Sequence, residues 1–384
     1  MSVKWLKSRR AAIGAAIVVA VAAIVIVPYT ILFEEETTDV GGMEMTGDEV
    51  DAMVRESMDV RSLSLLEPVG PSDRAATLDP KVVGGVTEFE LSARPARWEY
   101  RDRQSIAVWG YEGQIPGPAI HVGEGDKVRV TFTNDLPEAT TVHWHGVDVP
   151  FEQDGVPGIT QEPIKPGDSQ VYEFEARPAG TRFYHTHGSS MRDEARQLDM
   201  GLSGALIIEP KSPRATDRDY TLVLDEWLVE DGGLNAAMMS GAGHAAHNAG
   251  FNLFTINGRA APAFEPLAVK KGETMRLRLI NAGSSTTHPM HLHGHQFAIT
   301  AIDGNPVPSA ARQLRNVVTV SPGETYDLEL IADNPGVWML HCHELHHADA
   351  GMMTLLQYDG FEPVDKEHDR ESAKTHEGDE AGSH

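Results

Sequence analysis

The sequence predicts an all-β protein built from two tandem β-sandwich domains, over about residues 84–212 and 213–360. Three observations predict this fold. Apolar and polar residues alternate in short segments, turns rich in glycine and proline separate those segments, and no long amphipathic helical pattern occurs in this region. The order of segments also occurs twice, so the two domains are expected to be copies of one unit.

The overall composition is that of a folded protein. Of the 384 residues, 41% are hydrophobic, which supplies enough apolar surface for packed cores and excludes disorder as the main state. A formal net charge of −25 repels phosphate backbones, so nucleic-acid binding is not expected. With one cysteine the chain forms no intrachain disulfide, so disulfides do not stabilise the domains.

The first 36 residues are expected to be a membrane anchor or an export signal. Basic residues at positions 4, 7, 9 and 10 precede an uncharged apolar run over 11–33, which is long enough to span a bilayer as a helix. Acidic residues 34–36 follow, so the charge pattern places the rest of the chain outside the cytoplasm, anchored at the outer face or exported. The run is longer than the apolar part of most cleaved signal peptides, which favours an uncleaved anchor.

Two further segments flank the predicted domains. Residues 37–83 show no sustained periodicity and are interpreted as a stalk and lead-in. Residues 361–384 are dominated by charged and small residues and are interpreted as a disordered acidic tail.

The first domain contains an alternating segment over 123–132 that leads into His143-Trp144-His145-Gly146. A second turn at 165–168 is followed by a strand with Tyr172 and Phe174 on one face. The unit then closes on His185-Thr186-His187.

The second domain repeats this order. Its alternating segment over 271–279 leads into a histidine-rich stretch at 288–295, and a turn at 321–324 precedes a strand with alternating apolar residues. This unit closes on His341-Cys342-His343. Ten of the 18 histidines lie in the four short windows of the two domains, which chance does not readily explain.

A His-x-His pair on a strand places both imidazoles on the same face, because side chains alternate with period two. Four such pairs facing a common space would supply eight neutral nitrogens, a set suited to Cu, Zn, Fe or Ni. The four pairs are His143 and His145, His185 and His187, His291 and His293, and His341 and His343.

Cys342 indicates which metal. It lies between His341 and His343 and therefore points to the opposite face of its strand, where it can ligate a separate metal. A cysteine thiolate with two histidines and a weak axial methionine is the ligand set of a blue-copper electron-transfer site. His288, Cys342, His347 and Met352 supply that set. The alternative, a buried and inert cysteine, leaves the other three residues unexplained.

These motifs resemble those of the multicopper oxidase family, and the length resembles its two-domain, laccase-like members. The resemblance covers about residues 84–360 and implies two cupredoxin-like Greek-key domains with four coppers per chain. It implies one type 2 copper, one binuclear type 3 pair and one type 1 copper. His143 and His291 match the type 2 ligands. The type 3 ligands are matched by His145, His185, His187, His293, His341 and His343, and the type 1 ligands by His288, Cys342, His347 and Met352. His295 and His346 are not expected to bind copper.

The repeat provides an internal control. When the two domains are aligned on their His-x-His windows, the type 1 positions of the second domain correspond to Thr140, Thr186, Met191 and Arg196 in the first. None of these preserves the ligand type, so we expect a single type 1 copper, in the second domain.

The resemblance also implies the reaction. A donor is oxidised one electron at a time at the type 1 copper, electrons pass through Cys342 to His341 and His343, and O₂ is reduced to water. Asp154 matches a carboxylate that relatives use as a proton relay, although an Asp-Gly turn residue is the alternative. On the type 1 side, Ala348 stands where some relatives carry an acid, and Asp349 follows it.

Partners follow from the same resemblance. Two-domain relatives commonly assemble as homotrimers with trinuclear copper clusters between subunits, and we adopt that as a hypothesis. The donor, expected near His347 or His288, is left open between a phenol or aromatic amine and a metal ion. Met238, Met239, His244 and His247 lie in a loop over 236–250 and could capture cuprous ions, although a surface loop without a metal role is favoured.

Two other functions fit parts of the sequence. A copper nitrite reductase shares two such domains, but it would place its type 1 cysteine in the first domain, where Thr186 stands. A copper-binding electron carrier without oxidase activity needs only the type 1 set, which leaves eight histidines unexplained.

Overall fold

The computed structural model describes residues 38–40, 43–45, 66, 68–70, 76–230, 232–239 and 250–363. The predicted anchor over 1–36, most of the predicted stalk, His244 and His247, and the acidic tail beyond 363 lie outside the described residues. Within the part of the chain that the structure describes, no helix is long and apolar enough to cross a membrane. Strands β1 (Thr38–Val40) and β2 (Met43–Met45) form an antiparallel pair of their own.

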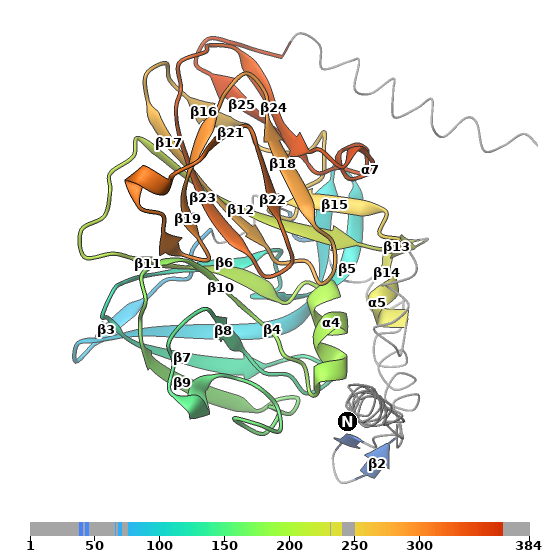
Figure 1. The fold of residues 1–384 in the computed structure, drawn as a ribbon. Helices are drawn as coiled ribbons and strands as arrows, with labels where there is room; N and C mark the ends of the chain where they lie inside the picture. The colour runs from blue at the N-terminus through green and yellow to red at the C-terminus, as the bar shows by residue number, and fades with distance from the viewer. Residues whose placement is uncertain are drawn as a thin grey trace, which may run out of the picture. The chain divides into compact units, whose positions relative to one another are not determined.

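The first domain is a pair of β-sheets, as predicted for an all-β fold (Figure 1). One sheet has the order β3-β4-β7-β9, with β5 also paired to β4, and the other has the order β6-β11-β10-β8. The strands of the first sheet are β3 (Lys81–Val83), β4 (Val86–Arg101), β5 (Gln104–Tyr111), β7 (Lys127–Asn134) and β9 (Ser169–Glu175). Those of the second are β6 (Gly117–Gly123), β8 (His143–His145), β10 (Gly180–His185) and β11 (Ser203–Glu209). Two short helices, η2 (Phe151–Gln153) and α4 (Met191–Asp199), complete the domain.

The second domain repeats this pairing with extra strands. Its larger sheet has the order β15-β12-β17-β23-β19-β20, with β21 on β19, and its smaller sheet has the order β16-β25-β24-β18-β22. The larger sheet contains β12 (Arg218–Trp227), β15 (Leu253–Ile256), β17 (Thr274–Asn281), β19 (Phe297–Ile302), β20 (Asn305–Pro306), β21 (Leu314–Arg315) and β23 (Thr325–Ile331). The smaller contains β16 (Leu267–Val269), β18 (His288–Leu292), β22 (Val317–Val320), β24 (Val337–Cys342) and β25 (Met353–Tyr358). The remaining elements are β13 (Val229–Glu230), β14 (Leu234–Asn235), α5 (Ala236–Met239), η3 (Ser309–Ala311) and α7 (Leu345–Asp349).

The predicted repeat is visible in the strand register. In the first domain β7 pairs parallel to β4 and antiparallel to β9, and in the second β17 pairs in the same way with β12 and β23. His143 lies opposite His185 across β8 and β10, and His291 lies opposite His341 across β18 and β24. The two copies therefore place their histidine motifs at equivalent positions.

Alternation along the strands builds the cores. In β7, Val128, Val130 and Phe132 are buried while the residues between them are more exposed, as the pattern over 123–132 predicts. In β8, Trp144 is fully buried between two partly exposed histidines, and its ring packs against those of Tyr172 and Phe174.

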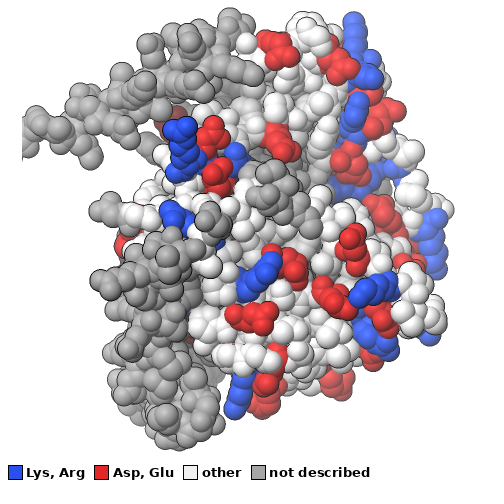
Figure 2. Space-filling view, turned by 180° about the vertical axis from the view of Figure 1, so that it is seen from behind, with Lys and Arg blue, Asp and Glu red and all other residues white. Residues whose placement is uncertain are grey.

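The opposite side of the structure from that in Figure 1 carries intermixed acidic and basic side chains (Figure 2).

The two domains pack on each other and share buried residues. One apolar cluster joins Trp98 and Ile106 of the first domain to Trp227 and Leu253 of the second. In addition, the Thr181 hydroxyl donates a hydrogen bond of 2.6 Å to Asp327 across the domain boundary. The predicted boundary at 212/213 falls between β11 and β12, whereas residues 69, 77 and 81–83 of the predicted lead-in already pair with the first domain.

Candidate metal centres

The four residues of the Cys342 site (His288, Cys342, His347 and Met352) come from three elements and a loop. His288 begins β18, Cys342 ends β24, His347 lies in α7 and Met352 precedes β25. The Cys342 Sγ is 3.5 Å from Nδ1 of His347 and 3.9 Å from Nδ1 of His288. Ligand atoms of these three residues all lie within 4.8 Å of one another, close enough to bind one ion.

Local hydrogen bonds fold the segment from Cys342 to Met352 back on itself. The side chain of Glu344 caps α7 by accepting from the backbone N–H of His347 at 3.1 Å. The N–H of Met352 donates to the carbonyl of His347, and the carbonyl of Met352 accepts from the N–H of Cys342. This loop therefore brings three of the four candidate ligands together with few residues.

The Cys342 site is buried, and a metal that binds there takes the place of the thiol proton. Cys342, His288 and Met352 are fully buried. Burial raises the pKa of the Cys342 thiol to about 12, so a cation that binds here must displace the thiol proton. Burial and the neighbouring His288 lower the pKa of His347, which keeps its imidazole neutral and able to act as a ligand.

The first-domain quartet (His143, His145, His185 and His187) gathers at β8 and the end of β10. The ring of His143 is 5.2 Å from that of His185 and 4.7 Å from that of His187, measured between centroids. Nδ1 of His145 approaches Nε2 of His185 to 3.3 Å. Proximity of this kind lets Nε2 of His185, whose Nδ1 faces a carbonyl, either accept a hydrogen bond from His145 or face an ion together with it.

The second-domain quartet (His291, His293, His341 and His343) repeats this arrangement at the ends of β18 and β24, since His293 follows β18 and His343 follows β24. The ring centroid of His291 is 4.8 Å from that of His293 and 5.5 Å from that of His343. Nε2 of His293 lies 3.0 Å from Nε2 of His341. Cys342 belongs to the hydrophobic core cluster on the other side of the strand, as period-two alternation requires.

Backbone carbonyls fix the tautomer of one pair of rings in each quartet. Nδ1 of His143 donates to the carbonyl of Asp154, and Nδ1 of His291 donates to that of Asn316. Nδ1 of His185 and of His341 each donate to the carbonyl of the following residue. Because a carbonyl only accepts, Nδ1 carries the proton and Nε2 keeps a free lone pair for a metal.

Burial favours the neutral form of five of the quartet histidines. Burial, reinforced by neighbouring imidazoles, lowers the pKa of His145 to about 4 and that of His185 well below its ordinary value. The same two causes lower the pKa of His293, and burial lowers those of His143 and His341. Neutral nitrogens, two close nitrogen pairs and a buried thiol together fit copper.

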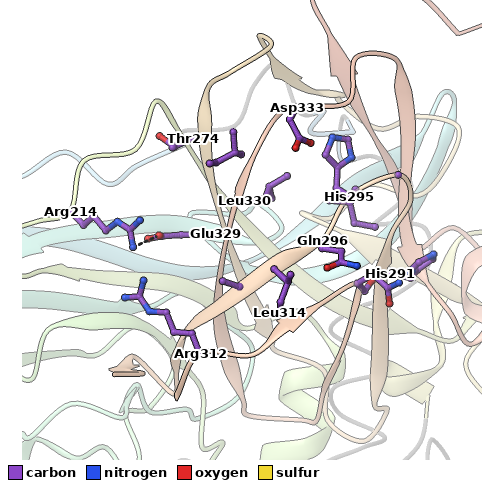
Figure 3. Close-up of a pocket in the computed structure, with 15 residues that line it drawn as sticks. Arg214, Thr274, His291, His295, Gln296, Arg312, Leu314, Glu329, Leu330 and Asp333 are labelled. Carbon is purple, nitrogen blue, oxygen red and sulfur yellow. Dashed lines mark hydrogen bonds and ion pairs between the residues drawn. The ribbon is translucent and has the colours of Figure 1, made fainter. Parts of the chain in front are cut away.

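Within one chain the two quartets remain separate. Among the described residues, no ring contact joins the first-domain quartet to the second-domain quartet, and β8 lies well apart from β18 and β24 (Figure 1). Figure 3 shows His291 at the edge of a cavity of about 810 Å³ in the second domain, which Arg312, Leu314 and Glu329 also line. The chain therefore presents two half-sites rather than one eight-histidine centre.

The first domain has hydrogen bonds where the second has the Cys342 site. The hydroxyls of Thr140 and Thr186 are 2.9 Å apart, and each donates to Oε1 of Gln197 at 2.7 Å. Beside them, Arg196 forms a buried ion pair with Glu138. Thr140 and Thr186, which the alignment of the repeats matches to the type 1 positions, are thus in contact with each other. The side chain of Met191 lies outside the described residues.

The structure also locates the predicted proton relay, one histidine that is not expected to bind copper, and the two methionines of the loop over 236–250. The carboxylate of Asp154 is 3.4 Å from Nδ1 of His143, at the first-domain quartet. His295 hydrogen-bonds the Tyr358 hydroxyl at 2.7 Å and stacks on its ring, while its Nδ1 lies 3.1 Å from the carbonyl oxygen of His293. Met238 and Met239 end α5, and their side chains are outside the described residues.

Sequence reasoning missed the acids that support the ligands. Glu194 in α4 lies 2.8 Å from Nδ1 of His187, and Glu226 in β12 lies 3.1 Å from Nε2 of His288. Glu194 follows His187 by seven residues, and helix α4 turns its side chain back toward His187. The sequence pattern indicates no helix there and therefore does not predict this contact. Glu226 is 62 residues from His288, and no local pattern connects them.

Comparison with known proteins gives a consistent picture. Two family models described as multicopper oxidase match residues 93–213 and 236–360. The solved blue copper oxidase from Nitrosomonas europaea is similar with 36% identity and a TM-score of 0.61, over 71% of this chain and 86% of that one.

Curated relatives are longer proteins. Laccase-15 from Oryza sativa subsp. japonica is 34% identical over 60% of this chain and 40% of its own length. Dihydrogeodin oxidase from Aspergillus terreus is 33% identical over 66% of this chain and 44% of its own. The chain therefore spans less than half the length of these two relatives.

Proposed function

Because the chain belongs to the multicopper oxidase family, we propose that it is a laccase-like oxidase. In this proposal it couples one-electron oxidation of a phenolic or aromatic donor, or of a metal ion, to the four-electron reduction of O₂ to water. The observation that supports it best is the arrangement on β24. There, Cys342 belongs to one candidate site while His341, its neighbour, contributes to another.

We assign the ligands to four coppers per chain. His288, Cys342, His347 and Met352 would hold a type 1 copper, and His143 and His291 would hold the type 2 copper. The type 3 pair would be held by His145, His185, His187, His293, His341 and His343. Copper bound in these places supplies one-electron transfer and the reduction of O₂. The backbone between Cys342 and its two flanking histidines provides the shortest covalent path between the sites.

Burial indicates where a donor can approach the Cys342 site. The side chain of His288 is 0% exposed, whereas that of His347 is 13% exposed. His347 stacks on Phe254 at 4.0 Å, which holds its ring in place at the surface. We therefore propose that the donor contacts the edge of His347 rather than that of His288.

Asp154 is suited to pass protons between solvent and the first-domain quartet. Its side chain is 36% exposed, and its carboxylate lies 3.4 Å from Nδ1 of His143. Its backbone carbonyl accepts from the same nitrogen, which keeps the residue beside the ring. We propose that Asp154 relays protons needed to form water.

The separation of the quartets supports an assembly in which neighbouring subunits share each centre, and we propose that this assembly is a homotrimer. A complete eight-histidine centre forms if the first-domain quartet of one subunit meets the second-domain quartet of the next. Each half-site has an exposed apolar side chain nearby: Phe151, 62% exposed, begins the short helix η2 that leads to Asp154, and Leu314, 66% exposed, lines the His291 cavity. Burial of such side chains would contribute to subunit association.

The location of the protein is proposed from the sequence. The apolar run over 11–33, between basic and acidic residues, supports an anchored or exported protein that works outside the cytoplasm. Fractionation of cells into membrane and soluble proteins tests this, and recovery of the intact chain in the cytoplasm would contradict it.

Oxygen uptake separates the proposed activity from its alternatives. The copper-loaded full chain is given a phenolic donor and, separately, nitrite with a reductant. Oxygen consumption with the donor supports an oxidase, nitrite consumption would indicate a nitrite reductase, and neither would indicate a carrier. Thr186, at the place of the first-domain cysteine of a nitrite reductase, favours the first outcome.

A further inference from the structure

Glu226 is a fully buried acid in direct contact with a residue of the Cys342 site. It lies near the end of β12, and neither its side chain nor that of His288 is exposed to solvent. Its Oε2 is 3.1 Å from Nε2 of His288. A carboxylate removed from water is costly unless hydrogen bonds and a nearby positive charge compensate it, so this position calls for an explanation.

The loop that precedes His288 is built around this carboxylate. Oε1 of Glu226 accepts from the backbone N–H of Ser285 at 2.9 Å and from that of Thr286 at 2.8 Å. At Gly283, an added Cβ would lie 2.3 Å from Oε2, so glycine leaves the space that the acid occupies. Two backbone amides therefore donate to Oε1, and Oε2 is the oxygen that faces His288.

The contact determines which nitrogen of His288 is available. A carboxylate oxygen accepts hydrogen bonds, so in this contact Nε2 of His288 is the donor to Glu226. Nδ1 then keeps its lone pair, and Nδ1 is the nitrogen that lies 3.9 Å from the sulfur of Cys342. A charged acceptor on the outer nitrogen also makes the imidazole a more basic ligand.

His347, the other histidine of the site, differs in this respect. Its Nε2 lies 3.4 Å from Glu344, whose side chain is 40% exposed. Solvent screens a charge at that position, whereas protein surrounds Glu226 completely. The chain therefore offers two carboxylates near equivalent nitrogens of one site, one buried and one screened.

We propose that Glu226 is a positioning residue of the Cys342 site, which orients His288, keeps its proton on Nε2 and favours the more positive oxidation state of the metal. The inference rests on the proposed copper site. It predicts that the buried charge lowers the reduction potential of that site, because removing an electron from the metal is easier beside a negative charge.

The test is the substitution Glu226→Gln in the copper-loaded full chain, with Glu344→Gln as the matched control. The potential is measured by redox titration of the thiolate-to-copper absorption. We expect Glu226→Gln to raise it by about 59 mV for each tenfold loss in preference for the oxidised ion. Copper affinity should fall by about 10- to 100-fold, the usual effect of losing such a supporting acid. Glu344→Gln should shift the potential less.

Equal shifts in the two variants, or an unchanged potential in Glu226→Gln, would overturn the proposal. If Glu226→Gln does not fold, Glu226→Asp provides the test, because it keeps the carboxylate but moves it away from His288. A rise in the reduction potential of this variant supports the positioning role, and an unchanged potential refutes it. A wild-type chain that binds copper without the thiolate absorption would refute the proposed function instead, so the two failures are distinguishable.

Discussion

Metal binding at Cys342 should depend steeply on pH, in a way that the structure determines. Burial holds the pKa of the thiol at about 12, against an ordinary value of 9.0. At any pH above the lowered pKa of His347 and below the pKa of the thiol, each copper that binds at this site therefore releases one proton from sulfur. Apparent affinity should rise tenfold per pH unit across this range and be lost progressively as the pH falls.

The magnitude follows from the same shift. A rise of three pKa units, from 9.0 to about 12, weakens apparent binding at neutral pH about a thousandfold, or roughly 4 kcal/mol, relative to an exposed thiol. His347 adds no such slope above pH 6.5, since burial lowers its pKa.

Competition between the protein and a chelator for cuprous ion, under anaerobic conditions at several pH values, measures this dependence. Cys342→Ser is the control, because a serine hydroxyl does not ionise in this range, and its slope reports the histidines alone. The difference between wild type and control should be one proton per site. A difference near zero would show that the thiol is already ionised, or that it is not a ligand, and would refute the reasoning.

Four further outcomes are expected. Cys342→Ser should abolish the blue absorption and donor oxidation while far-ultraviolet circular dichroism stays unchanged; retained colour would identify another ligand. Glu138→Ala should lower the free energy of unfolding by up to about 3–5 kcal/mol in denaturant titration, because it removes the buried carboxylate that lies 2.6 Å from the Arg196 guanidinium and leaves Asp193 at 3.5 Å as the acid beside it. The exposed Glu90→Ala should change the free energy of unfolding little. Leu314→Asp should shift sedimentation from trimer toward monomer with the blue absorption preserved, and an unchanged trimer would place the interface elsewhere. Asp154→Asn should slow oxygen consumption more than the anaerobic reduction of the blue absorption by donor, and equal slowing would argue against a proton relay.

The fold could be predicted because its signals are local. Alternation over residues 123–132 and 271–279 determines which side chains enter each core, and the repeat indicates that both domains share one topology. The strand in the lead-in was less predictable. Residues 81–83 are exposed and do not alternate between buried and exposed positions, and they form a strand by pairing with β4.

The candidate site also has a part that local sequence predicts and a part that depends on packing between distant segments. Period-two alternation at His341-Cys342-His343 places the sulfur and the imidazoles on opposite faces, and that geometry depends only on adjacent residues. The contact between Glu226 and His288 depends on the packing of β12 against the loop before β18, and an Asp-Glu pair in a strand resembles an ordinary solvated pair. The separation of the quartets depends on domain packing, which no short motif encodes.

Copper content with absorption and electron-spin resonance spectra of the purified, copper-loaded full chain tests the central claim most directly. We predict four coppers per chain, of which one has the blue thiolate absorption, one gives an ordinary type 2 resonance and two are silent as a coupled pair. A single blue copper per chain, with the eight quartet histidines unoccupied at saturating copper, would contradict the account.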